Sequence, residues 1–226
     1  MHRRLLSHFI KNNIISERQA AYLKGDSTIQ QVFYMIHLIR TTWSKKQIMQ
    51  GVYLDMSASF DKAWHKAIIA KLEQIQVKGA CLDVFRSYLS NRKQIVVIGQ
   101  CKSDIKDVQA GIPQGSRLGP LLWLLYINDI VEDLESETLL FADDTCIFAS
   151  GSDPTVTTEI LNRDLQKISI WASKWKVLFN PGKTKEMIFS DKLLSNSLPV
   201  MFNNIEVQRV FQHKHLGIWL SSSLSW

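Results

Sequence analysis

The chain has 226 residues, and 46% of them are hydrophobic, so it is long and apolar enough to bury a core as one domain. Lys and Arg number 27 against 21 Asp and Glu, and the formal charge of +6 suits a polyanionic partner. The longest apolar run, residues 121–127, is far shorter than the roughly 20 residues that a membrane-spanning helix needs. The composition therefore predicts a soluble, intracellular protein without a membrane span.

Three cysteines are present, Cys81, Cys101 and Cys146. They form no Cys-x-x-Cys pair and leave one residue over, so neither a disulfide framework nor a zinc knuckle is indicated. We interpret them as reduced thiols of the core.

The first half of the chain alternates helical and strand-like segments. Residues 25–28 offer good N-caps, and an amphipathic helix is expected over residues 28–43. A short apolar strand over residues 50–54 ends before Asp55, a position where open sheets place ligands. Further helices are expected over residues 62–76 and 82–89, followed by a strand over residues 94–98.

The second half begins with residues 110–120, whose three glycines and two prolines forbid a regular element and let the backbone approach a ligand closely. A buried helix is expected over 121–131 and an amphipathic helix over 155–174. Residues 175–190 predict two short strands around a turn at 180–183, and a further pair of strands is expected over 198–207 and 214–220. Without repeats or linkers, these elements predict one α+β unit.

Two adjacent carboxylates, Asp143 and Asp144, lie between two apolar, β-prone runs within residues 138–149, which predicts a tight hairpin with both acids at its tip. At an effective dielectric constant of about 20, two such charges about 5 Å apart repel by roughly 3 kcal/mol. A divalent cation would relieve this repulsion. A solvated Asp-Asp turn without a ligand is an equally open interpretation of this stretch alone.

Asp55, the loop around Gln114 and the Asp143-Asp144 hairpin together are the parts that nucleotidyl transfer needs. Two Mg²⁺ ions about 4 Å apart would bind the attacking 3′-hydroxyl and the departing pyrophosphate, and they require hard oxygen ligands from more than one strand. Gln114 offers both a donor and an acceptor to an incoming nucleotide or a template.

Three stretches resemble the motifs of a known family. Residues 52–65 are similar to motif A of reverse transcriptases, residues 111–120 to motif B and residues 141–144 to motif C. Residues 19–28, 180–185 and 214–220 resemble, in order, the stretch before motif A, motif D and motif E of non-LTR (LINE-type, jockey-like) retrotransposon polymerases. The resemblance covers nearly the whole chain, and its motifs stand in the right order.

This resemblance implies an α+β reverse transcriptase palm, in which helices back an antiparallel sheet and the carboxylates gather on its open face. Residues 1–49 would be partial fingers and residues 50–226 mainly palm, with the thumb absent. The implied function is an RNA-directed DNA polymerase, with Mg²⁺ or Mn²⁺ as cofactor and with an RNA template, a DNA primer and deoxynucleoside triphosphates as partners.

Carried over position by position, the resemblance makes Asp55, Asp143 and Asp144 the metal-binding catalytic residues. Phe60 would be the gate that excludes a ribose 2′-hydroxyl, and Gln114 and Gly115 would contact nucleotide and template. Lys183 would donate a proton to the leaving pyrophosphate, with a solvated strand-end lysine as the alternative reading.

The chain also departs from the family pattern. Ser59 replaces the usual alanine, a change from which we expect little consequence. The family normally carries an arginine-containing fingers segment, a thumb and an endonuclease domain, and we expect this chain to lack them. The alternative function is therefore a catalytically inactive, truncated or co-opted fragment that binds nucleic acid. We interpret Asp61 as a structural hydrogen-bond acceptor and His213 and His215 as surface residues.

Overall fold

A five-stranded sheet forms the centre of the computed structural model, which describes residues 1–23, 25–190 and 198–225. Its strand order is β11-β8-β1-β7-β6, and all neighbours are antiparallel except β11 and β8. The strands are β1 (Ile48–Leu54), β6 (Glu137–Phe141), β7 (Asp144–Gly151), β8 (Lys185–Phe189) and β11 (Gln208–Arg209).

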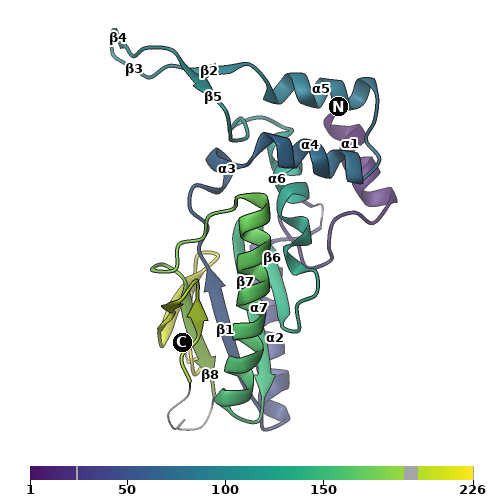
Figure 1. Ribbon diagram of the computed structural model, residues 1–226. Helices are drawn as coiled ribbons and strands as arrows, with labels where there is room; N and C mark the ends of the chain where they lie inside the picture. Colours follow the sequence, from purple (N-terminus) through teal and green to yellow (C-terminus); the bar gives the residue numbers. More distant parts are fainter. Residues whose placement is uncertain (24, 191–197, 226) are drawn as a thin grey trace.

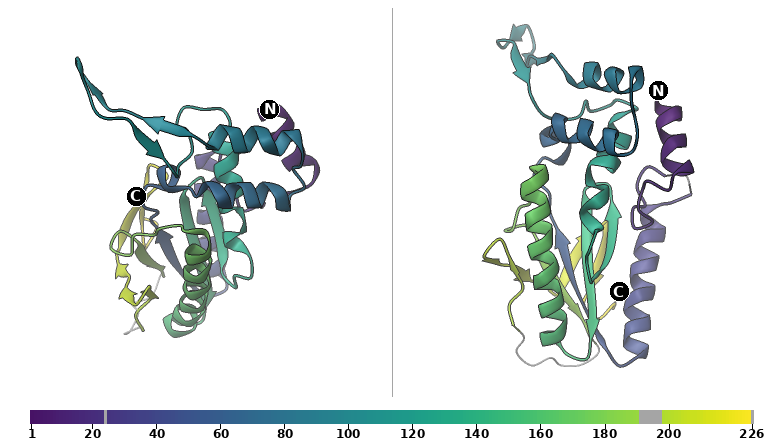
Figure 2. Two further views of the ribbon diagram at one scale, coloured as in Figure 1. Left: turned by 45° about the horizontal axis from the view of Figure 1, so that its top comes forward. Right: turned by 45° about the vertical axis from the view of Figure 1, so that its right-hand side comes forward.

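Helices cover both faces of this sheet, with α7 (Pro154–Trp175) on one face and α2 (Thr28–Ser44) on the other (Figures 1 and 2). Successive residues of β1 point to opposite faces, so Val52 joins the core under α7 and Tyr53 the core under α2. Every residue of β1 is therefore buried. The expectation of an open sheet face was wrong, because the amphipathic helix predicted at residues 28–43 packs onto that face.

A helical layer lies beyond one end of the sheet (Figure 1). Within it, α6 is buried almost all round because its residues are nearly all apolar, as predicted. The layer comprises α1 (His2–Lys11), α3 (Ser59–Lys62), α4 (His65–Gln74), α5 (Ala80–Leu89), α6 (Gly119–Ile127) and the 3₁₀ helix η1 (Asn128–Val131).

The helix expected over residues 62–76 is divided between α3 and α4. The break falls at Ala63 and Trp64, where the backbone turns to bond another segment: Trp64 pairs with Ala110, and the Gly111 N–H donates to the Ala63 carbonyl at 2.9 Å. The loop of residues 110–120, here called the Gly/Pro loop, thus interrupts the helix because it bonds to the backbone groups of residues 63 and 64.

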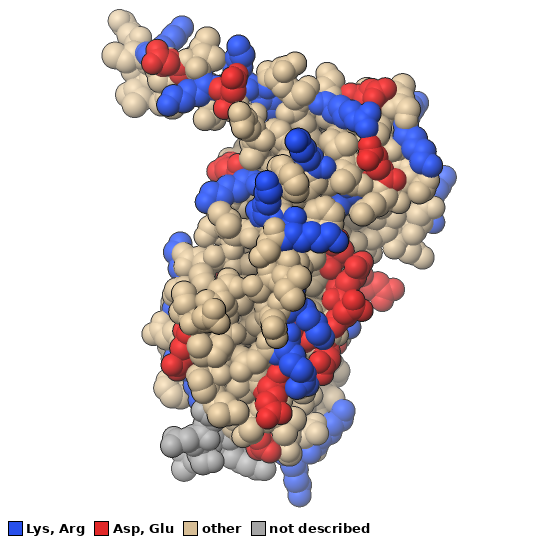
Figure 3. Space-filling view, in the orientation of Figure 1, with Lys and Arg blue, Asp and Glu red and all other residues tan. Residues whose placement is uncertain are grey.

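A two-stranded ribbon replaces the single strand expected over residues 94–98. It projects from the helical layer, and its outer end is mainly neutral in the space-filling view (Figures 1 and 3). Ile98 is 76% exposed, because the ribbon extends away from the helices of the described chain (Figure 1). Its strands are β2 (Arg92–Gln94), β3 (Val97–Ile98), β4 (Cys101–Lys102) and β5 (Lys106–Val108).

The C-terminal strands also differ from the prediction. Only β8 forms within residues 175–190, because α7 continues to Trp175 and the following segment contributes a single bridge between Phe179 and Met56. Residues 198–207 and 214–220 each contain a chain reversal rather than one strand. The resulting hairpins are β9 (Met201–Phe202) with β10 (Ile205–Glu206) and β12 (Gln212–His215) with β13 (Ile218–Ser221).

Cys146 is buried as expected, but Cys81 and Cys101 are exposed, so a core role for all three cysteines was wrong. Cys81 lies on the solvent-facing side of α5, and Cys101 lies in the exposed ribbon. In the described part of the chain, no helix is both long enough and apolar enough to cross a bilayer.

Candidate active site

Two neighbouring strands bring the predicted carboxylates to one end of the sheet. Leu54, the last residue of β1, pairs with Thr145 of β7, so the same register places Asp55 beside Asp144. Phe141 of β6 pairs with Asp144 of β7, leaving Ala142 and Asp143 to make the turn, with Ala142 at φ 57°. The tight hairpin predicted from the sequence is confirmed, and it carries both of its acids toward Asp55.

These three carboxylates line a small pocket of about 190 Å³. Lys183 lines it too, from the turn before β8, so the structure brings together the four most polar of the predicted site residues. The remaining lining residues come from β1 and the segment just after it, from β7 and from the β12–β13 hairpin: Tyr53, Leu54, Met56, Thr145, His213, Lys214 and His215.

The acids of this pocket are electrostatically coupled. Asp144 is exposed on one side, but the burial of its other side raises the pKa of its carboxyl group. The neighbouring charges of Asp143 and Asp55 raise this pKa further. Among the described residues, no group of three or more His, Cys, Asp or Glu side chains is close enough to hold a metal ion as it stands. The donor chemistry nevertheless fits a hard divalent cation, because three carboxylates meet there and a positive charge would relieve their repulsion.

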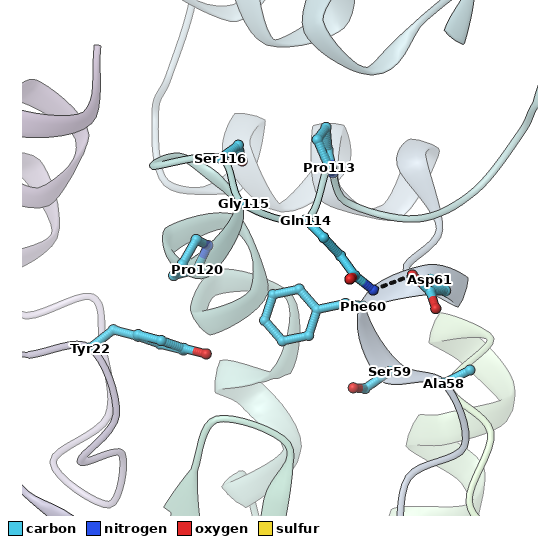
Figure 4. Close-up of a pocket in the computed structure, with 10 residues that line it drawn as sticks. All are labelled: Tyr22, Ala58, Ser59, Phe60, Asp61, Pro113, Gln114, Gly115, Ser116 and Pro120. Carbon is cyan, nitrogen blue, oxygen red and sulfur yellow. Dashed lines mark hydrogen bonds between the residues drawn. The ribbon is translucent and has the colours of Figure 1, made fainter. Parts of the chain in front are cut away.

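A second, larger pocket of about 570 Å³ holds the other predicted residues, Phe60, Gln114 and Gly115 (Figure 4). Phe60 stacks on the buried Trp123 of α6 with ring centroids 5.1 Å apart, which fixes its ring at the pocket wall. Gln114 Nε2 donates to Asp61 Oδ1 at 2.8 Å, as expected for Asp61 as an acceptor. The other lining residues are Tyr22, Ala58, Ser59, Asp61, Pro113, Ser116 and Pro120.

Glycine is required where the Gly/Pro loop passes over α3. Gly111 has φ +94°, and a Cβ there would lie 2.7 Å from the Asp61 carbonyl oxygen. Gly115 also has a left-handed backbone, with φ +75°, although a Cβ there would meet no other atom within 4 Å. The Ile112 N–H donates to the Phe60 carbonyl at 2.8 Å, so the loop and α3 form one hydrogen-bonded frame around the pocket.

Two residues of this region had no predicted role. The Ser59 hydroxyl donates to Asp143 Oδ2 at 2.8 Å and so links the two pockets. Tyr22 has φ 60°, a conformation that is rare for a bulky side chain, and its hydroxyl points into the larger pocket (Figure 4). Partial burial raises the pKa of Tyr22, and the charge of Asp143 raises it further. Only the position of Tyr22 within residues 19–28 could have drawn attention to it.

His213 and His215 were expected at the surface, but His213 is partly buried and His215 is buried. The hairpin that carries them lies against the sheet, where their rings contact Tyr53 with centroids 4.3 and 5.2 Å away. His215 is 5% exposed, and burial, with a smaller contribution from His213, lowers its pKa to about 4. Burial also lowers the pKa of His213, and the charge of Lys185 adds to this. Both histidines thus border the carboxylate pocket as neutral rings.

The fold and these motifs belong to a known class of enzyme. The family model described as reverse transcriptase (RNA-dependent DNA polymerase) matches residues 1–220, so the chain belongs to the reverse transcriptase family. Apo telomerase from Candida tropicalis, truncated from its C-terminal domain, has a similar fold, with a TM-score of 0.65 over 99% of this chain and 43% of that one at 14% identity. The α+β fold is therefore that of a reverse transcriptase domain.

The relatives in sequence are polymerases of non-LTR mobile elements. The chain is 28% identical over 231 residues to the RNA-directed DNA polymerase from mobile element jockey of Drosophila melanogaster, and this match covers 98% of the chain. It is 27% identical over 231 residues to the "Probable RNA-directed DNA polymerase from transposon BS" of the same species, again over 98% of the chain. The chain spans 25% of the length of each of these two relatives.

Proposed function

We propose that this chain is the catalytic part of an RNA-directed DNA polymerase, which adds deoxynucleotides to a primer 3′-end opposite an RNA template. The observation that carries the proposal is the convergence of Asp55, Asp143 and Asp144 in one pocket, beside a second pocket of nucleotide size. Membership of the reverse transcriptase family supports the same reaction.

In this proposal Asp55, Asp143 and Asp144 would hold Mg²⁺ or Mn²⁺. Bound there, the ions would supply the positive charge that stabilises the attacking and leaving oxygens of phosphoryl transfer. The raised pKa of Asp144 supports this role, because a carboxylate that is costly to ionise alone gains most from a cation. Lys183, exposed at the rim of the same pocket, would donate a proton to the departing pyrophosphate.

The larger pocket would receive the deoxynucleotide. Phe60 would contact the sugar, where its ring leaves no room for a 2′-hydroxyl because Trp123 fixes it from behind. Gln114 and Gly115 would contact the nucleotide and the template strand, and the bond from Gln114 to Asp61 would hold the amide at the rim in the free protein. RNA template, DNA primer and deoxynucleoside triphosphates are thus the proposed partners.

We further infer a division of the chain into partial fingers over residues 1–49 and mainly palm over residues 50–226. All three carboxylates and the five-stranded sheet, apart from the first two residues of β1, lie within the second range, which supports its assignment as palm. The helical layer draws on both ranges, since α1 packs beside α6.

Primer extension tests the reaction. The chain is incubated with an annealed RNA template and DNA primer, Mg²⁺ and all four deoxynucleotides, and is compared with Asp143→Asn. We expect extension by the wild type and none by the variant, because the amide keeps the shape of the carboxylate but loses its charge. Thermal unfolding of both proteins shows whether the fold is intact.

Extension that persists in Asp143→Asn would contradict the catalytic assignment. If neither protein extends the primer but both bind it, the inactive nucleic-acid-binding alternative gains support. Salt dependence of binding does not separate these functions, because each of them neutralises phosphates.

A further inference from the structure

Ser59 occupies the boundary between the two pockets. It is the first residue of α3 and lines the larger pocket next to Phe60, while its hydroxyl donates to Oδ2 of Asp143, which lines the carboxylate pocket. The two residues are 84 positions apart in the sequence, so only the fold creates this contact.

The hydrogen bond serves Asp143 rather than the local helix. Ser59 is not the N-cap of α3; Ala58 is, and no side chain caps this short helix. Ala58 has φ 52°, a left-handed backbone conformation that turns the chain so that Ser59 faces the carboxylate. Within the part of the chain that the structure describes, no other side chain donates a hydrogen bond to Asp143.

The contact limits the motion of Asp143. Rotation of an aspartate carboxylate about its last bond is weakly restrained, so an unsupported Asp143 would sample many orientations in its hairpin turn. A donor on Oδ2 fixes one orientation and leaves Oδ1 and the remaining lone pair of Oδ2 free for a ligand. Partners of this kind orient metal ligands in many proteins, and their loss typically weakens metal binding by 10- to 100-fold.

We propose that Ser59 is a positioning residue that holds the Asp143 carboxylate ready for a divalent cation. The inference rests on the proposed function, since it takes Asp143 as a cation ligand. It adds to the site a residue that had no role in the sequence motifs, and it makes the orientation of Asp143 depend on the segment that carries Phe60.

Binding of Mn²⁺ to the free protein tests this without catalysis. Free Mn²⁺ is measured by electron paramagnetic resonance during titration of the wild type, Ser59→Ala and Ser59→Thr, with no nucleotide or primer present. We expect Ser59→Ala to raise the Kd about tenfold, because the carboxylate loses its donor. Ser59→Thr should bind as the wild type does, because it keeps the hydroxyl.

Ser57→Ala is the matched control. Ser57 lies two residues earlier on the same segment, and its side chain makes no hydrogen bond within the described residues, so its loss should leave the Kd unchanged. Thermal unfolding is recorded for every variant. Ser59 is only partly buried and alanine favours helix, so Ser59→Ala should fold as the wild type does.

Asp143→Asn distinguishes a failure of the proposed metal site from a failure of the proposed positioning role of Ser59. If it binds Mn²⁺ as tightly as the wild type, the proposed metal site itself is wrong. If it loses binding while Ser59→Ala retains the wild-type Kd, the metal site stands and the positioning role is overturned. Weakened binding in Ser59→Thr to the same extent as in Ser59→Ala would also overturn it, because the hydroxyl would then be irrelevant.

Discussion

At the scale of single residues, the candidate site depends on side chains that other side chains hold in place. Phe60 is stacked on Trp123, Gln114 is bonded to Asp61, and Asp143 is bonded to Ser59. Each of these restraints comes from a segment that is distant in the sequence. The predicted site residues are thus held in position in the free protein, which would lower the cost of orienting them for a ligand.

The gate role of Phe60 leads to a prediction for sugar selection. Phe60→Val removes the ring that would meet a ribose 2′-hydroxyl, so discrimination between deoxynucleotides and ribonucleotides should fall by up to about 100-fold. Single-nucleotide incorporation with each sugar measures this ratio. Phe60→Tyr keeps the ring and its stacking on Trp123 and serves as control. An unchanged discrimination ratio in Phe60→Val would contradict the proposed role of Phe60 in sugar selection.

At the scale of elements, the β12–β13 hairpin completes the sheet face that α2 leaves uncovered near the carboxylates. Its inward side places Leu220 and His215 in the core beside Tyr53 and Cys146, with the Sγ of Cys146 3.4 Å from His215 Nε2. Its outward side carries Lys214 and the 62% exposed Trp219, which pair across the strands. The hairpin therefore depends on a histidine that must stay neutral.

Acid should destabilise the fold through His215. Its pKa is about 4 in the folded protein and 6.5 ordinarily, so the unfolded chain binds the proton more readily and stability falls as pH drops from 6.5 towards 4. At about 1.4 kcal/mol per pKa unit, the loss between pH 7 and pH 5 should be about 2 kcal/mol. Urea unfolding at both pH values measures it. His215→Gln does not titrate and should lose about 2 kcal/mol less; an equal loss in both proteins would refute the prediction.

At the scale of the whole molecule, both pockets lie where the helical layer meets the end of the sheet. Lys71 of α4, 3% exposed, is central to this junction. Its ammonium group donates to the Tyr126 carbonyl at 2.7 Å, forms an ion pair with Asp129 and lies 4.2 Å from the ring centroid of Trp175 in α7. One side chain thus connects α4, α6, η1 and α7.

Removal of this cation should weaken the junction. Lys71→Ala leaves Asp129 without its ion-pair partner and opens a gap beside Trp175, so the free energy of unfolding should fall by about 3 kcal/mol. Lys66→Ala, at an exposed position of the same helix, is the control and should change it by less than about 0.5 kcal/mol. Urea unfolding of both variants measures the two changes in the free energy of unfolding. Similar small changes in the two variants would show that Lys71 does not join the layers.

The sequence alone determined the elements whose signals are local. The helices at residues 28–43 and 155–174 and the Asp143-Asp144 hairpin formed as predicted, because periodicity, capping and turn residues act over a few positions. The buried helix expected over residues 121–131 also formed, but as α6 up to Ile127 followed by the 3₁₀ helix η1. Motif order also predicted the family correctly.

Only the tertiary structure decided which surfaces these elements cover. The apolar run at residues 94–98 became an exposed ribbon, His215 became buried, and Ser59 acquired Asp143 as its partner. Hydrophobicity and side-chain chemistry fix what a residue can do but not which distant segment comes to lie against it. That choice depends on contacts between segments many positions apart, which no local pattern in one sequence records.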